Sequence, residues 1–259
     1  MGLLEVLFKS AGRAVTKAAA QKVDEVVREK SKEVLDDLIP TNSKPSQQKS
    51  TAPAQNTSAY DTTPDLPQPF GYKLGWLCIK GKTPEEIISI LGLKNVQTAN
   101  WESGLDAVYE DMFSKVFVSP VINGYVLAVG YVPFGVMKSV EQELDALDKI
   151  AAQVDEMTCF TTQRTVDIHV WAKYVTGKLI RGYGWIGESG EIYLNRGEIT
   201  PEEINLGFTN LIQDPECDWD TVDIPDEEYV MNISAAWGVD TSFTDGDYET
   251  GTGFVGDIV

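Results

Sequence analysis

The sequence predicts an α+β domain with a mainly antiparallel sheet and flanking helices, preceded by a long N-terminal amphipathic helix and a disordered linker. After residue 70, segments typical of strands alternate with segments of helical period. Residues 83–87 and 200–204 have the same sequence, Thr-Pro-Glu-Glu-Ile, which provides the N-cap, the proline and the capping-box glutamate of a helix start. Residues 40–69 are rich in Pro, Ser, Thr, Gln and Asn, and a segment of this composition buries too little apolar surface to fold.

Residues 1–39 are predicted to form an amphipathic helical arm. Apolar residues recur there every eleven residues, as at Leu4 and Val15, and Pro40 ends the run. An eleven-residue repeat is close to the period of a straight helix, so the apolar residues form one stripe. We expect Leu4, Phe8 and Val15 to mark an association surface on this stripe. The pattern leaves open whether the arm binds another protein, associates with itself or lies on a membrane surface.

The domain boundaries follow from the changes in composition. We expect the linker at residues 40–69, an acidic α+β domain at 70–240 and a loose acidic tail at 241–259. Strands are expected at residues 72–79, 116–119, 125–130, 157–162, 166–175, 179–186 and 192–194. Helices are expected to begin at Thr83 and Thr200 and to cover residues 139–153 and 227–237. Asn123-Gly124 predicts a tight hairpin, and the three strands from residue 157 to 186 should form an antiparallel meander.

Charge is distributed unevenly along the chain. The formal net charge is −19, from 40 Asp and Glu against 21 Lys and Arg. Residues 1–59 hold nine Lys and Arg and seven Asp and Glu, whereas residues 60–259 hold 12 Lys and Arg and 33 Asp and Glu. A domain with this excess repels the phosphates of nucleic acids and attracts cations and basic proteins. We therefore expect a basic protein as the partner and no nucleic acid.

The partner-binding face is expected where carboxylates are dense, between residues 214 and 228. Trp219 lies between two aspartates there and is the first candidate for a desolvated anchor. Trp101 is a second candidate, because it also lies beside polar and acidic residues in a predicted loop. For both tryptophans, capping the core is the alternative role. The expected partner-binding residues are Trp219, Asp218, Asp220, Asp223, Glu227, Glu228 and Trp101.

His169 is the only histidine, so a site with several histidine ligands cannot form within one chain. It lies in the predicted strand at residues 166–175, on the face that carries polar side chains. We expect a polar cluster of Arg164, His169 and Arg181. This cluster is either a binding or acid–base site or a set of cross-strand pairs on a partly covered sheet.

No motif in the sequence indicates a catalytic centre, a metal site or a cofactor. Cys159 could approach His169 as a nucleophile, but a buried inert thiol is the expected role because no motif marks an oxyanion hole. The glycines form neither a GxGxxG sequence nor a phosphate loop. We therefore expect a protein that is not an enzyme and that binds no cofactor.

The cysteines and the N-terminus predict a cytoplasmic protein. The three cysteines lie far apart without a CxxC pair, which fits reduced thiols. Charged residues interrupt the N-terminal apolar residues, so the segment does not match a signal peptide, and no stretch approaches the roughly eighteen apolar residues of a membrane span. The arm leaves attachment to the inner face of the membrane as an alternative.

Part of the chain resembles a group of bacterial proteins that has no established activity. The resemblance spans about residues 74–237 and is carried by a threonine-rich hairpin at 160–172, by segments 179–183 and 187–191, and by a late acidic helix ending in Ala-Trp. It implies a bacterial source. Compact, acidic bacterial α+β domains resemble the immunity proteins of polymorphic toxin systems. We therefore expect a cytosolic immunity protein that neutralises a basic toxin domain by occlusion, with a membrane-surface adaptor or scaffold anchored by the arm as the alternative.

Overall fold

The computed structural model describes residues 59–111, 114–131, 139–164, 167–187, 191–208 and 225–258. The strands and helices within these ranges belong to one unit, residues 60–259. The predicted N-terminal arm and most of the predicted linker lie outside the described residues, so the helix expected there stays a prediction.

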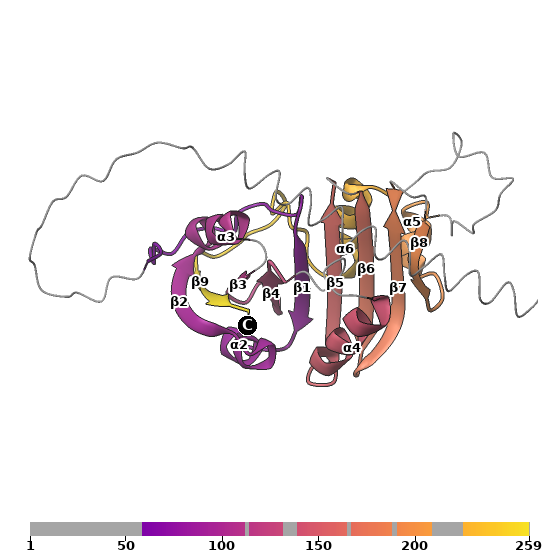
Figure 1. Ribbon diagram of the computed structural model, residues 1–259. Coiled ribbons are helices and arrows are strands. Elements are labelled where there is room, and N and C mark those ends of the chain that lie inside the picture. Colours follow the sequence, from indigo (N-terminus) through magenta and orange to yellow (C-terminus); the bar gives the residue numbers. More distant parts are fainter. Residues whose placement is uncertain are drawn as a thin grey trace, which may run out of the picture. The chain divides into compact units, whose positions relative to one another are not determined.

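Nine strands of the described residues form one antiparallel sheet (Figure 1) in the order β2-β9-β3-β4-β1-β5-β6-β7-β8. The strands are β1 Gly75–Lys80, β2 Lys94–Asn100, β3 Lys115–Val118, β4 Tyr125–Val129, β5 Glu156–Gln163, β6 Ile168–Val175, β7 Lys178–Ile186, β8 Glu191–Arg196 and β9 Thr252–Asp257. Strands β5 to β8 follow one another along the chain and in the sheet. The predicted antiparallel meander is therefore confirmed, and β8 extends it.

Helices cover both faces of the strands β5 to β7. Within the described ranges the helices are α2 Pro84–Leu91, α3 Trp101–Glu110, α4 Val140–Ala151, α5 Pro201–Asn205 and α6 Glu227–Trp237. In Figure 1, α4 lies in front of these strands and α6 behind them. The apolar side of each helix is buried, through Leu144 and Leu147 in α4 and through Val230 and Ile233 in α6. The α+β class is confirmed. Over the residues described, no helix combines the length and the apolar character needed to cross a bilayer.

Aromatic side chains hold α6 against the sheet. The rings of Trp76 in β1 and Phe160 in β5 stack with centroids 5.3 Å apart, and Phe160 meets Trp237 of α6 at 6.1 Å. The indole N–H of Trp76 donates to the Ser234 hydroxyl of α6 at 3.2 Å. Large rings contribute most of the buried apolar area of a core, and a satisfied indole N–H removes the penalty of burying it. The main core therefore lies between the sheet and α6.

Both copies of the Thr-Pro-Glu-Glu-Ile sequence begin a helix, as predicted. Thr83 accepts a hydrogen bond from the Glu86 amide at the start of α2, and Thr200 accepts one from the Glu203 amide at the start of α5. In each copy the glutamate side chain accepts from the threonine amide at 2.8 Å. These reciprocal bonds satisfy backbone donors that a helix start leaves free.

The Asn123-Gly124 turn joins β3 and β4, as predicted. Both residues have positive φ, 51° and 83°, which a type I′ turn requires at its two central positions. Asparagine and glycine adopt this conformation with little strain. Ile122 and Tyr125 exchange backbone hydrogen bonds of 2.7 and 2.8 Å across the turn. The local sequence therefore accounts for the conformation of this turn.

The prediction of a loose acidic tail is wrong, because the residues near the C-terminus form β9 inside the sheet. β9 pairs with β2 on one side and with β3 on the other. The glycines of β9 make its composition resemble that of a loop, which is why the sequence pattern does not predict a strand here. A Cβ atom at Gly253 would lie 2.2 Å from the Val118 carbonyl oxygen. Glycine is therefore required where β9 runs closest to β3.

Neither β2 nor α3 is expected from the sequence pattern. β2 is mostly polar and lies at one edge of the sheet, where exposure on its outer side removes the need for an apolar pattern. The α3 helix begins because the Asn100 side chain accepts the amide of Ser103 at 3.0 Å. The helix then buries Leu105 and Val108 under the first half of the sheet.

The last residues of the predicted linker belong to the folded unit. The Asp65 carboxylate accepts the backbone N–H groups of Trp101 and Glu102 at 2.7 and 3.0 Å, so it caps α3 together with Asn100. The Asp65 backbone also pairs with Gly251, just before β9. The expected domain boundary at residue 70 is therefore wrong. A lack of large apolar residues predicts a linker, but the contacts that attach Asp65 to the domain are polar.

We expect a chain that begins at residue 60 to unfold cooperatively, with a midpoint close to that of the full chain. A chain that begins at residue 68 should be less stable by about 1–2 kcal/mol, because α3 loses the Asp65 carboxylate. Urea unfolding followed by tryptophan fluorescence measures both. Asp65→Ala in the longer chain is the control. Equal stability of the two shortened chains would show that the Asp65 cap contributes nothing.

Candidate partner-binding face

Several expected site residues lie outside the described residues, namely Trp219, Asp218, Asp220 and Asp223 of the partner-binding face and Leu4, Phe8 and Val15 of the arm. Their roles stay predictions. The structure does describe the remaining ones, which are Glu227, Glu228, Trp101, Arg164, His169 and Arg181. These six residues lie in different surroundings and do not form one site.

Trp101 is part of the core and not a surface anchor. It is the first residue of α3, it is fully buried, and its ring lies 5.1 Å from Phe117 and 5.5 Å from Phe243. The predicted loop and the predicted partner contact are therefore wrong for this residue, and the alternative role of capping the core is the one observed. The two caps from Asn100 and Asp65 are what turn this segment into a helix.

Glu227 and Glu228 lie in the first turn of α6. Asp226 caps this helix by accepting the amide of Tyr229 at 2.9 Å. Three consecutive carboxylates at a helix N-terminus are stabilised by the partial positive charge there. Glu228 is exposed, whereas Glu227 pairs with Arg164 at 3.5 Å. Glu228 therefore presents its charge to solvent, with no ion-pair partner among the described residues, while Glu227 is partly engaged by Arg164.

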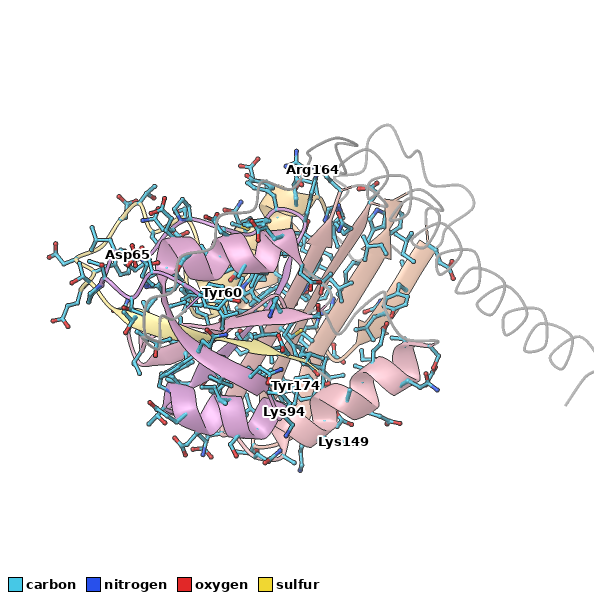
Figure 2. All side chains as sticks on the ribbon, turned by 60° about the vertical axis from the view of Figure 1, so that its left-hand side comes forward. Tyr60, Asp65, Lys94, Lys149, Arg164 and Tyr174 are labelled. Carbon is cyan, nitrogen blue, oxygen red and sulfur yellow. The ribbon has the colours of Figure 1, made fainter. Side chains whose placement is uncertain are left out.

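Arg164 and Glu227 belong to a surface that also carries two exposed tyrosines. The Arg164 guanidinium lies 5.2 Å from the ring centre of Tyr72, and Figure 2 shows this arginine at the upper end of the strands. Tyr72 is 46% exposed and Tyr109, in α3, is 43% exposed. Partial burial raises the pKa of the Tyr109 hydroxyl, and the nearby backbone of Gly71, the neighbour of Tyr72, lowers it by a smaller amount. We call Tyr72, Tyr109, Arg164 and Glu227 the tyrosine face.

His169 does not form a cluster with Arg164 and Arg181. Its ring is buried, with Nδ1 3.1 Å from the Thr162 hydroxyl and Nε2 2.9 Å from the Asp167 carboxylate. Thr162 is also its cross-strand partner in β5. Arg164 instead forms an ion pair with Glu227, and Arg181 forms one with Glu203. Only His169 is paired with a cross-strand neighbour, because the partners of the two arginines lie in the helices α6 and α5.

The series Thr162, His169 and Asp167 has the chemical types of a nucleophile, a base and an acid. Thr162 is fully buried, so a substrate cannot reach its hydroxyl in this structure. Instead, the series fixes the hairpin between β5 and β6. Asp167 has φ of 50°, its carbonyl accepts the Gly187 amide at 2.7 Å, and a Cβ at Gly187 would collide with its carboxylate. A structural role for His169 follows.

Arg181 and Glu203 form a fully buried ion pair between β7 and α5. The Arg181 Nε atom donates to both carboxylate oxygens of Glu203, at 2.9 and 3.0 Å. The Trp171 indole N–H of β6 donates to the same carboxylate at 2.8 Å. Arg181 Nη1 donates to the Asn195 side chain of β8 at 2.8 Å. One pair of opposite charges therefore connects three strands and a helix.

Aromatic rings enclose this buried pair. The guanidinium of Arg181 lies 5.3 Å from the ring centre of Tyr183 and 5.6 Å from that of Phe208. Tyr229 of α6 donates its hydroxyl to the Glu203 carbonyl at 3.4 Å. Burial raises the pKa of Tyr183 and Tyr229 well above the usual tyrosine range. The rings exclude water, which makes the pairing of the two charges obligatory.

Sequence reasoning did not identify Glu203 as a partner of Arg181. The second Thr-Pro-Glu-Glu-Ile sequence predicts that Glu203 caps a helix. Because capping already accounts for this glutamate, the sequence gives no indication of a second role as the partner of Arg181. The two tyrosines of the tyrosine face also went unpredicted, because a single tyrosine carries no motif. Their exposure depends on which neighbours the fold brings to them.

The described cysteines are inert thiols, as expected for Cys159. Cys78 and Cys159 are buried, and burial raises the pKa of Cys78 to about 12. Burial also raises the pKa of Cys159 well above its usual value. A thiol reacts as its thiolate, so neither group is activated as a nucleophile.

Comparison of the chain with protein-family models, with curated proteins and with solved structures gives no significant match.

Glu203→Gln should lower the free energy of unfolding by about 3–5 kcal/mol, because it leaves the Arg181 charge buried without its counter-ion. Glutamine can still form the capping box, so this substitution removes the charge of Glu203 without removing the helix cap. Glu86→Gln in the first copy of the motif is the matched control, since Glu86 is exposed and should tolerate the change. Urea unfolding measures both variants. Equal effects would contradict a special role for the buried pair.

In a Cys217→Ser variant, the two remaining thiols should resist a thiol reagent at about pH 8 until the protein unfolds. The reason is that the folded state holds the pKa of both thiols above this pH. Ellman titration in increasing urea follows the reaction, and the signal should rise together with the loss of tryptophan fluorescence. Rapid labelling of Cys159 in the folded state would reopen its role as a nucleophile.

Proposed function

We propose that this protein is a cytoplasmic binding module that neutralises a basic bacterial toxin domain by occluding it. The observation that carries the proposal is the excess of negative charge over residues 60–259, with 33 Asp and Glu against 12 Lys and Arg. A cationic partner is the class of macromolecule that such a surface attracts over long range.

The distribution of this charge supports the proposal. Residues 225–258, which include α6 and β9, hold eight Asp and Glu and no Lys or Arg. Glu227 pairs with Arg164 and Asp257 pairs with Lys115, but no Lys or Arg within this segment compensates its other acidic residues. Uncompensated charge opposes folding through self-repulsion, so its retention is more easily explained by a partner than by stability.

The described chemistry supports binding over catalysis. The candidate hydroxyl of Thr162 and the candidate thiol of Cys159 are both buried. The accessible groups include tyrosine rings, which are enriched at protein interfaces, and carboxylates, which steer a cationic partner towards the surface. The alternative function, a membrane-surface adaptor, depends entirely on residues 1–39 and stays a prediction.

The association rate with the partner should be about tenfold to a thousandfold higher at low salt than at high salt, because ions screen the acidic surface over a Debye length of about 8–10 Å at 0.10–0.15 M. The candidate partner is the product of the gene next to the one that encodes this chain. Stopped-flow mixing of the two purified proteins across ionic strength measures the rate.

Growth of cells that express this neighbour, with and without the present chain, tests neutralisation directly. We expect growth arrest by the neighbour alone and recovery on co-expression. A neutral or acidic partner, or a rate that does not depend on salt, would contradict the proposed function.

A further inference from the structure

The α3 helix has one acidic outer face that faces solvent. Its inner residues, among them Leu105 and Val108, are buried against the sheet. Glu102, Asp106 and Glu110 are exposed and occur at intervals of four residues. Residues four apart lie on the same side of a helix, with a rise of about 6 Å between them. Three carboxylates therefore form a line along α3.

This line of carboxylates opposes the stability of α3. Like charges four residues apart repel each other, and an acid in the last turn meets the partial negative charge of the helix C-terminus. Glu110 lies in that last turn, Asp111 follows it, and α3 contains no basic residue. Folding alone does not account for such a pattern, whereas a cationic ligand would remove the repulsion.

Tyr109 lies beside this line on α3, and its ring is exposed. Tyr72, which directly follows Gly71 in the chain, is also exposed. A tyrosine side chain has few rotatable bonds, so an exposed tyrosine loses little entropy on binding, and its ring can contact both the apolar stem and the charged end of a Lys or Arg side chain.

The protein already contains one example of the interaction that this surface would make. At Tyr72 the guanidinium of Arg164 lies over the ring at 5.2 Å and reaches the Glu227 carboxylate at 3.5 Å. A cation held by a tyrosine ring and a carboxylate is therefore a stable arrangement on this face. Tyr109 has the same pair of elements beside it, with Asp106 and Glu110 in place of Glu227, but its own helix supplies no cation.

We propose that the outer face of α3, with Tyr109 and Tyr72, is the docking surface for a basic segment of the partner protein. Lys or Arg side chains of that segment lie against the Tyr109 ring and pair with Glu102, Asp106 and Glu110. This assignment rests on the proposed function, because it takes the partner to be a basic protein and names where it binds.

The test uses the full chain and a blocked synthetic peptide with arginine at every fourth position, labelled for fluorescence anisotropy at low salt. The first variant is Glu102→Gln/Asp106→Asn/Glu110→Gln in α3. The matched control is Glu141→Gln/Asp145→Asn/Asp148→Asn in α4, which removes the same charge from another exposed helix surface. We expect the α3 variant to bind the peptide at least about tenfold more weakly than the α4 variant.

A second pair of variants tests the ring. Tyr109→Ala should weaken binding by about tenfold, whereas Tyr109→Phe keeps the ring and should retain most of the affinity. Thermal unfolding of each variant confirms that it is folded. Equal losses in the α3 and α4 variants would overturn the docking surface, because the peptide would then sense only total charge.

The same variants are then measured with the neutralised toxin domain. A partner that binds the α3 variant as tightly as the unchanged chain would also overturn the docking surface, while the proposed function would stand. If the unchanged chain binds neither the peptide nor a basic neighbour-encoded protein, both the docking surface and the proposed function fail.

Discussion

The buried ion pair between Arg181 and Glu203 is the interaction on which the second half of the fold depends. Removing two charges from water is unfavourable, and their attraction offsets this only when the remaining hydrogen-bonding groups are also satisfied. Here β6 contributes an indole donor to the Glu203 carboxylate and β8 an amide acceptor to Arg181 Nη1, while Arg181 Nη2 is buried without a hydrogen-bond partner among the described residues. The pair therefore specifies one arrangement of these elements, since any shift would leave a buried charge exposed to apolar surroundings.

The first half of the sheet depends on contacts between residues far apart in the chain. β9 lies between β2 and β3, so the sheet is complete only when residues 252–257 join segments more than a hundred residues earlier. Asp65 contributes to the same region, because it caps α3 and pairs with Gly251. Both chain ends of the unit thus stabilise one region, which makes its folding non-local and cooperative.

The charged residues of this molecule fall into two groups, those that stabilise the fold and those that are available to a binding partner. Charges that serve the fold are buried or paired, as Glu203 and Asp65 are. The acidic residues on the outer side of α3 and Glu228 at the start of α6 face solvent, and Glu110, in the last turn of α3, destabilises the helix that carries it. The tyrosine face lies among these exposed charges and supplies rings that a cationic side chain can contact. This contrast is the physical basis for assigning recognition to the surface and none to the buried polar groups.

The sequence by itself determined the elements whose causes are local. The two capping boxes and the Asn123-Gly124 turn each depend on residues within a few positions of one another, and the meander from β5 to β7 pairs strands that follow one another along the chain. Tertiary structure decided β9, the burial of Trp101 and the separation of His169 from both arginines. The two identical helix starts show why: Glu86 is exposed beside Lys82, whereas Glu203 is buried beside Arg181. A motif specifies the hydrogen bonds of its own backbone, but its solvent exposure and its charge partners come from strands distant in the sequence.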